Sequence, residues 1–219
     1  MRQKLFILTV SAFLFLSFIL FSYLVAKETF ISLDFDTTVK LQDHLSRKWD
    51  FPFSILSVLG SAEITMLIWI ILLIISLIKK YWFTVLTLPL FFASVAVEIF
   101  GKLFVLHPSP PHFLYRGVIS FNFPSHYVHT NYSYPSGHMA RTAFLVSFLF
   151  CFYFIRSRRK NLLIPLFLIL YLATMFVSRV YLGEHWLSDV LGGLLIGSSF
   201  GIFTASTIPL KFKNHLNIK

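Results

Sequence analysis

Long apolar runs alternate with short polar or charged segments along the whole chain. A helix needs about 20 apolar residues to cross a bilayer, and several runs reach that length. The pattern predicts an all-α fold, a bundle of six transmembrane helices that forms a single domain over residues 1–219. The expected spans are 5–25, 55–78, 82–106, 139–155, 162–177 and 186–208.

The first apolar run has a second interpretation, because it follows Arg2 and Lys4 and precedes small residues near Ala26. A basic start before an apolar core is also typical of a secretory signal peptide. Signal peptides have cores of about 7–15 residues, whereas this run covers all of 5–25. We therefore interpret it as a retained membrane helix.

Two longer polar segments separate the spans. Residues 27–50 mix charges with spaced apolar residues, which predicts an interfacial segment that serves either as a lid or as a connector. Residues 107–134 are rich in Pro, Ser, Asn and aromatic residues, which predicts a cap loop over the outer face. The histidines of this loop are His107, His112, His126 and His129. Their spacing matches no usual ligand pattern, so we expect no metal and no other cofactor.

Composition excludes several classes of protein. With 57% hydrophobic residues and 27 Phe, the chain is not a soluble globule. The single cysteine, Cys151, excludes an intramolecular disulfide and a cysteine-based metal cage, and its apolar surroundings predict a packed thiol. The formal net charge of +10 could indicate a nucleic-acid partner, but the distribution of the charges argues against one.

Charge separates the two sides of the predicted bundle. With six spans, both termini share a side whose cations are Arg2, Lys4, Lys79, Lys80, Arg156, Arg158, Arg159, Lys160, Lys211, Lys213 and Lys219, with no acid. The other side balances five cations with five acids. The positive-inside rule therefore predicts cytoplasmic termini and suggests a bacterial plasma membrane. Lys102, His138 and His185 would then all lie at the outer face.

Residues 178–189 concentrate ionisable side chains between two apolar runs, which at membrane depth indicates a functional site. If a helix starts near Glu184, His185 and Asp189 are four residues apart on one face and can form a hydrogen bond. A carboxylate on one imidazole nitrogen leaves the other nitrogen as a nucleophile. Arg179 could bind a phosphate or carboxylate with two parallel hydrogen bonds.

A second candidate motif, Tyr134-Pro135-Ser136-Gly137-His138, stands directly before the fourth predicted span. The free backbone N–H groups at a helix start can bind an anion. His138 could donate a proton to a leaving oxygen. Two histidines with cationic and N–H donors between them are suited to phosphoryl transfer without a metal.

In these motifs the chain resembles membrane members of the type-2 phosphatidic acid phosphatase superfamily, including phosphatidylglycerophosphatase B and undecaprenyl-diphosphatase types. The second family motif, Pro-Ser-Gly-His, matches residues 135–138, and the third matches Ser178, Arg179, His185 and Asp189. In the first motif Lys102 is present, but Ser109 stands where the family has an arginine.

The resemblance implies an integral membrane lipid phosphatase that hydrolyses a phosphomonoester or pyrophosphate through a phosphohistidine. It implies catalytic roles for His185, His138 and Asp189. The implied phosphate-binding residues are Lys102, Ser136, Gly137 and Arg179. Candidate lipids are phosphatidic acid, phosphatidylglycerol phosphate, undecaprenyl diphosphate and lipid A phosphates. A phosphotransferase and a non-catalytic lipid-phosphate-binding or transport protein remain alternatives because of Ser109, and the sequence does not indicate an oligomeric state.

Nearby charges could compensate for the missing arginine. Arg141, three residues after His138, either points toward the phosphate site or extends to lipid phosphates, and Arg116 in the cap loop is another candidate. Glu98 lies four residues before Lys102 and can pair with it. That pair could be structural, or Glu98 could position Lys102 for phosphate.

Overall fold

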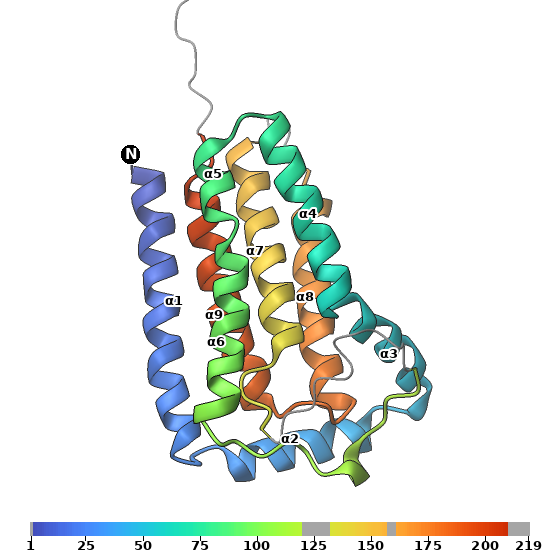
Figure 1. Ribbon diagram of the computed structural model, residues 1–219. Coiled ribbons are helices and arrows are strands. Elements are labelled where there is room, and N and C mark those ends of the chain that lie inside the picture. The colour runs from blue at the N-terminus through green and yellow to red at the C-terminus, as the bar shows by residue number, and fades with distance from the viewer. Residues whose placement is uncertain (1, 120–131, 157–160, 210–219) are drawn as a thin grey trace, which may run out of the picture.

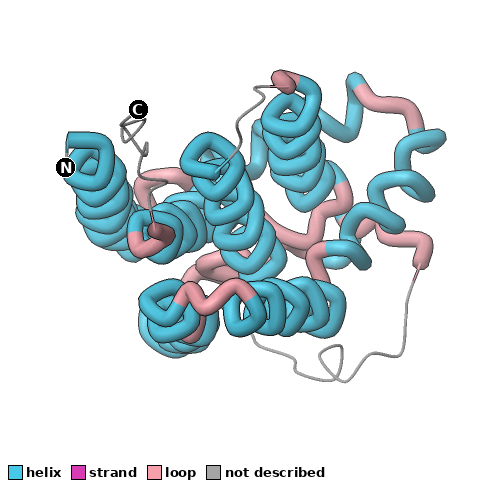
Figure 2. Tube along the Cα trace, turned by 90° about the horizontal axis from the view of Figure 1, so that it is seen from above, coloured by secondary structure: helices cyan, strands magenta, loops and turns pink. Residues whose placement is uncertain are grey.

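The computed structural model describes residues 2–119, 132–156 and 161–209, and within these ranges the regular structure is helical. Five of the described helices are long and apolar enough to cross a membrane, and a bent pair makes up to six. The helices stand side by side as a bundle, seen from the side in Figure 1 and along their axes in Figure 2. The prediction of an all-α transmembrane bundle is confirmed.

The helical elements are α1 Arg2–Ala26, α2 Ile31–His44, η1 Arg47–Trp49, α3 Asp50–Leu59, α4 Ala62–Ile78, α5 Trp82–Thr87, α6 Leu90–Phe104, η2 His112–Leu114, α7 Gly137–Arg156, α8 Leu163–Tyr181 and α9 Leu187–Ser206.

The second expected span, 55–78, is two helices rather than one. The segment Arg47–Leu59 and α4 meet at an angle of 46°. Ser61 adopts an extended backbone, and its hydroxyl accepts a hydrogen bond from the N–H of Ile64, which caps the new helix. The break therefore has a local cause, a glycine at position 60 followed by a serine N-cap.

Helices α7 and α9 form the centre of the bundle. Added Cβ atoms at Gly197 and Gly201 of α9 would come within 2.1 Å of the Ala140 carbonyl oxygen and 2.3 Å of the Phe144 carbonyl oxygen of α7. Only glycine permits so close a backbone approach. This contact holds the C-terminal half of α9 against the first half of α7.

Helix α2 crosses one end of the bundle, opposite the end where α1 begins (Figure 1). Its buried residues are the polar Asp34, Thr38 and Gln42, spaced four residues apart, whereas Leu33 and Phe35 are exposed. The interfacial helix thus turns a polar stripe toward the protein and apolar residues outward. It covers the end of the bundle where α6 and α8 finish and α7 and α9 begin.

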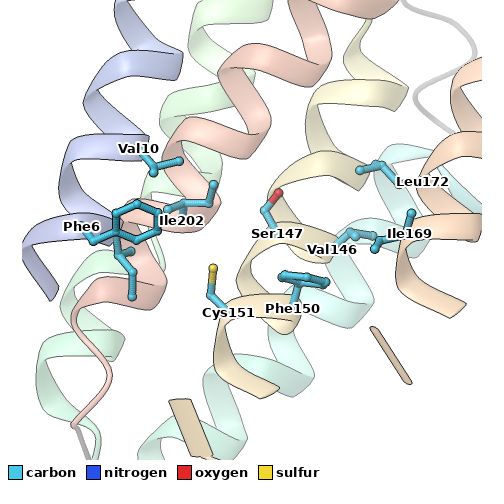
Figure 3. Close-up of a pocket in the computed structure, with 10 residues that line it drawn as sticks. Phe6, Val10, Val146, Ser147, Phe150, Cys151, Ile169, Leu172 and Ile202 are labelled. Atoms are coloured by element: carbon cyan, nitrogen blue, oxygen red, sulfur yellow. The ribbon is translucent and has the colours of Figure 1, made fainter. Parts of the chain in front are cut away.

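An apolar cavity of about 330 Å³ lies between α1, α7, α8 and α9 (Figure 3). Phe6 and Val10, near the start of α1, help to line it, and so do Phe150 and Cys151 of α7. The half-buried Cys151 therefore faces apolar side chains, as its sequence context predicts. This cavity is distant from the ionisable residues discussed below.

Candidate functional site

The turn between α8 and α9 brings His185 back toward Arg179. Helix α8 continues past the expected end at Val177 and so includes Arg179, whose carbonyl oxygen accepts the N–H groups of Glu184 and His185 at 3.3 Å. Gly183 has φ +65°, and an added Cβ would lie 2.3 Å from the Leu114 carbonyl oxygen. The turn therefore needs glycine for both its conformation and its packing.

His185 and Asp189 interact as the spacing predicts, although His185 lies in the turn and α9 begins only at Leu187. Nδ1 of His185 is 3.4 Å from Oδ2 of Asp189, a long contact of the kind found in catalytic sites without substrate. Oδ2 also accepts the N–H of Trp186 at 2.9 Å, which caps α9. Burial, together with the charges of Arg179 and Lys102, lowers the pKa of His185 despite the opposing effect of Asp189, so the imidazole is neutral at neutral pH.

The start of α7 is tied directly to α9. The N–H of Ser136 donates to the carbonyl oxygen of Asp189 at 2.9 Å. This backbone donor was expected to bind phosphate, and it is instead used to join the two motifs. The Ser136 hydroxyl is buried and has no hydrogen-bond partner among the described residues, so it is the available donor at this position.

A carboxylate lies against the expected phosphate site. Lys102 Nζ is 2.9 Å from Glu98 Oε1, and Arg141 Nη1 is 2.7 Å from Glu98 Oε2. An added Cβ at Gly137 would lie 1.9 Å from Glu98 Oε1, so Glu98 sits directly at the start of α7. Arg141 is only 8% exposed, so it is accommodated by this ion pair inside the protein and not by extension to lipid.

Arg179 also has a carboxylate partner. It forms an ion pair with Glu184 and donates a hydrogen bond to Ser57 of α3, and Ser57 in turn donates to Glu184 at 3.4 Å. Arg179 is 1% exposed, and its Nε has no hydrogen-bond partner among the described residues. Arg141 Nε is unpaired in the same way. Buried donors without acceptors indicate a place where an anion can bind.

His138 lies among these charges. Arg179, Arg141, His185 and Lys102 all act on it electrostatically. A side chain added at Gly60, in the bend between α3 and α4, would come within 3.3 Å of its Cδ2. Four helices therefore contribute ionisable groups to one buried region, as the sequence motifs require.

Two residues of this region were not identified as site residues from the sequence. His107 Nδ1 is 2.9 Å from Asp189 Oδ1, and His107 Nε2 is 3.7 Å from Asp34 Oδ2. One sequence pattern could have identified Asp34, namely the polar stripe that it forms with Thr38 and Gln42 at helical spacing. For His107 there was no pattern beyond its place among the loop histidines.

The proposed substitutes for the missing arginine differ in position. Ser109 itself is exposed. Arg116 lies over the ring of Tyr181 at 5.3 Å from its centroid and donates to its hydroxyl at 3.3 Å, so it is engaged elsewhere. Arg141 is the better candidate, since it shares Glu98 with Lys102.

The cap loop is only partly described. The described parts are residues 107–119 and 132–134. In these parts the N–H of Arg116 donates to the Leu182 carbonyl oxygen and the N–H of Ser133 donates to the His107 carbonyl oxygen, both at 2.9 Å. The loop histidines His126 and His129 fall outside the described residues. Among the residues that the structure does describe, no three His, Cys, Asp or Glu side chains are grouped to hold a metal ion.

Fold and geometry together define a multi-pass membrane protein whose buried, histidine-containing site is suited to an anion. Residues 81–213 match the family model of the PAP2 superfamily, and the chain belongs to this superfamily. Among curated proteins, no match is found.

Two solved structures are similar to the chain. One is the transmembrane PAP2-type phosphatidylglycerolphosphate phosphatase from Bacillus subtilis, with a TM-score of 0.71 and 20% identity over 89% of this chain and 93% of that one. The other is LpxE from Aquifex aeolicus, with a TM-score of 0.57 and 25% identity over 78% of this chain and 94% of that one. The expected resemblance is confirmed for the superfamily and for the membrane phosphatase fold.

Proposed function

We propose that the protein is a lipid phosphatase that hydrolyses a phosphomonoester or pyrophosphate group through a phosphohistidine on His185. The observation that carries the proposal is the contact of His185 Nδ1 with Asp189 beside a buried group of cations. That contact leaves Nε2 as the nucleophilic nitrogen. A neutral imidazole has the lone pair that attack on phosphorus requires.

In the first step, His185 Nε2 forms a bond to phosphorus while the bond to the leaving oxygen breaks. His138 donates the proton that the leaving oxygen takes up, and Asp189 stabilises the charge that develops on His185. In the second step, His138 takes a proton from water, the water oxygen bonds to phosphorus, and the bond to His185 breaks. Inorganic phosphate and the original histidine are the products.

The phosphate oxygens would be held by Lys102, Arg141 and Arg179, together with the Ser136 hydroxyl and the N–H of Gly137. Phosphoryl transfer depends mainly on such positioning and charge stabilisation. Because Glu98 and Glu184 pair with these cations, the incoming phosphate takes over contacts that the two carboxylates hold.

A lipid substrate is supported by a second apolar cavity, of about 290 Å³, between α4, α7 and α8. Leu59, which lines it, directly precedes Gly60, where an added Cβ would lie 3.3 Å from His138 Cδ2, so one end of the cavity lies next to the site in the chain. An acyl or prenyl chain suits such a surface. The asymmetry of charge supports cytoplasmic termini and an outer-face site in a bacterial plasma membrane.

Phosphate release tests this proposal. Purified protein in detergent, with a chelator present, would be given short-chain phosphatidic acid, phosphatidylglycerol phosphate, undecaprenyl diphosphate and a lipid A phosphate. We expect release from at least one lipid, and a loss of at least about 1,000-fold in His185→Ala. His112→Ala, which changes an exposed histidine of the described cap loop, should retain wild-type release. Equal release by wild type and His185→Ala, or none with any lipid, would contradict the proposal.

A further inference from the structure

Asp189 is shared between two histidines. Its Oδ2 faces His185 at 3.4 Å, and its Oδ1 faces His107 at 2.9 Å. The other nitrogen of His107 faces a second carboxylate, Asp34 Oδ2, at 3.7 Å. Exposed fractions are 0% for Asp189, 5% for His107 and 2% for Asp34, so the line of groups is closed to solvent.

Asp34 is itself held by α9. Its two oxygens accept the N–H of Ser188 at 2.8 Å and the Ser188 hydroxyl at 2.7 Å. Asp34 therefore caps the N-terminus of α9 from a different helix, α2, which the positive end of the helix dipole favours. The result is a continuous path from the interfacial helix through His107 to the proposed nucleophile.

His107 is the group of this path that can carry a positive charge. Burial lowers its pKa, but the hydrogen bond to Asp189 and the charges of Asp189, Asp34 and Glu28 outweigh burial and raise the pKa above its ordinary value of 6.5. An imidazolium between two carboxylates removes the repulsion that they would otherwise exert on each other. Burial also raises the pKa of Asp34.

We infer that His107 is a positioning residue for the proposed reaction, which fixes Asp189 through Oδ1 so that Oδ2 faces His185, and which Asp34 holds in place. Carboxylates that orient a histidine are commonly hydrogen-bonded in turn, and loss of such an outer partner costs activity without touching substrate. The positive charge of His107 also offsets part of the charge of Asp189. His185 therefore stays neutral to a lower pH than it would beside an unshared carboxylate.

The positioning role of His107 rests on the proposed function. Of the two readouts below, only the kinetic one requires the protein to release phosphate. The charged groups that act on His185 are Asp189, Arg179, Lys102, His138 and Glu98. None of these changes in a variant at position 107, so a shift in the titration of His185 reports the loss of the His107 charge.

The first readout is kinetic. His107→Asn keeps a donor near the position of Nδ1 but removes the charge and the contact with Asp34. We expect kcat to fall about 10–100-fold with KM unchanged. The acid limb of kcat/KM should move up by about one pH unit, because a nearby positive charge is lost. Asp34→Asn, which removes the second contact of His107, should lower kcat by less, and His112→Asn is the matched control with no effect.

The second readout does not need turnover. In protein labelled with ¹⁵N-histidine, the His185 signal is assigned by its loss in His185→Asn and then titrated in wild type and in His107→Asn. We expect the His185 pKa to be higher in His107→Asn. If that variant does not fold, His107→Gln is titrated in its place.

Folded variants with an unchanged His185 titration and an unchanged kcat would overturn the inference. A titration shift in a protein that releases no phosphate from any lipid would leave the positioning role intact and contradict only the proposed function. Phosphate release from a lipid, with no shift in the His185 titration of the variant at position 107, would contradict the positioning role and leave the proposed function intact.

Discussion

The site has two sides, one that holds the cations and one that holds the histidines, and their charges are balanced in different ways. On the cation side, which is the first, Lys102 and Arg141 share Glu98, and Arg179 pairs with Glu184. Each of these carboxylates occupies contacts that a phosphate would need. On the second side, His107 and His185 share Asp189, and each uses its own carboxylate oxygen.

This difference separates a part of the site that must change partners from a part that need not. Binding a phosphate on the first side requires Glu98 and Glu184 to give up hydrogen bonds, so affinity there is a competition between anions. On the second side the proposed nucleophile, His185, already contacts Asp189. Positioning in advance lowers the barrier only where the geometry persists through the reaction.

The largest effect should come from Arg179, the most buried of the three cations. Lysine at this position keeps the charge but loses the planar set of donors, so it cannot hold two phosphate oxygens together with the Ser57 contact. We expect Arg179→Lys to lower kcat/KM by about 100–1,000-fold, measured as phosphate release from the preferred lipid.

Arg116→Lys is the matched control, since Arg116 belongs to the same end of the bundle but binds Tyr181. Its kcat/KM should stay close to wild type. An equal loss in both variants, or no loss in Arg179→Lys, would remove the distinction between phosphate-binding and supporting arginines.

An intermediate effect is expected at Glu98. Glutamine at this position keeps acceptor and size but removes the negative charge that competes with phosphate for Lys102 and Arg141. We expect Glu98→Gln to bind inorganic phosphate about five-fold more tightly, which corresponds to about 1 kcal/mol. The measurement is the inhibition constant of phosphate at fixed pH.

Asp43→Asn, which changes an exposed acid of α2, should leave that inhibition constant unchanged. Weaker binding of phosphate to Glu98→Gln would mean that Glu98 supports the anion site by positioning the cations. The competition described for this side of the site would then be wrong.

The smallest effect concerns pH. Burial lowers the pKa of His185 below 6.5, and only its neutral form can attack phosphorus. As pH falls through that lowered pKa, the imidazole gains a proton and kcat/KM falls, so the acid limb should lie below pH 6.5. A profile of kcat/KM against pH checks this, because it reports the free enzyme. If kcat/KM had already fallen to half of its maximum at a pH above 7 as the pH is lowered, the proposal of a neutral, buried nucleophile would be contradicted.

Sequence patterns predicted those parts of the molecule that depend on local spacing. The apolar runs predicted the spans, and the four-residue spacings predicted the pairs Glu98–Lys102 and His185–Asp189. In each case the relevant partners are neighbours on one helix or share its periodicity.

Contacts between distant segments were beyond sequence reasoning. Asp34 reaches Ser188 across 154 positions and His107 reaches Asp189 across 82, and no periodicity links such residues. The use of the Ser136 N–H by Asp189 and the pairing of Arg141 with Glu98 are also tertiary effects. The bend at position 60 was missed because a glycine followed by a serine does not interrupt an apolar run enough for hydropathy alone to indicate a break in the helix.

The most direct test of the account is to isolate the covalent intermediate. Wild-type protein would be mixed with short-chain phosphatidic acid, or whichever lipid it prefers, labelled with ³²P, quenched within one turnover under alkaline conditions, and digested for mass spectrometry. We expect a base-stable, acid-labile phosphoryl group on His185 that is absent from His185→Asn. Phosphate release at the wild-type rate with no label on His185, or with the label on another residue, would contradict it.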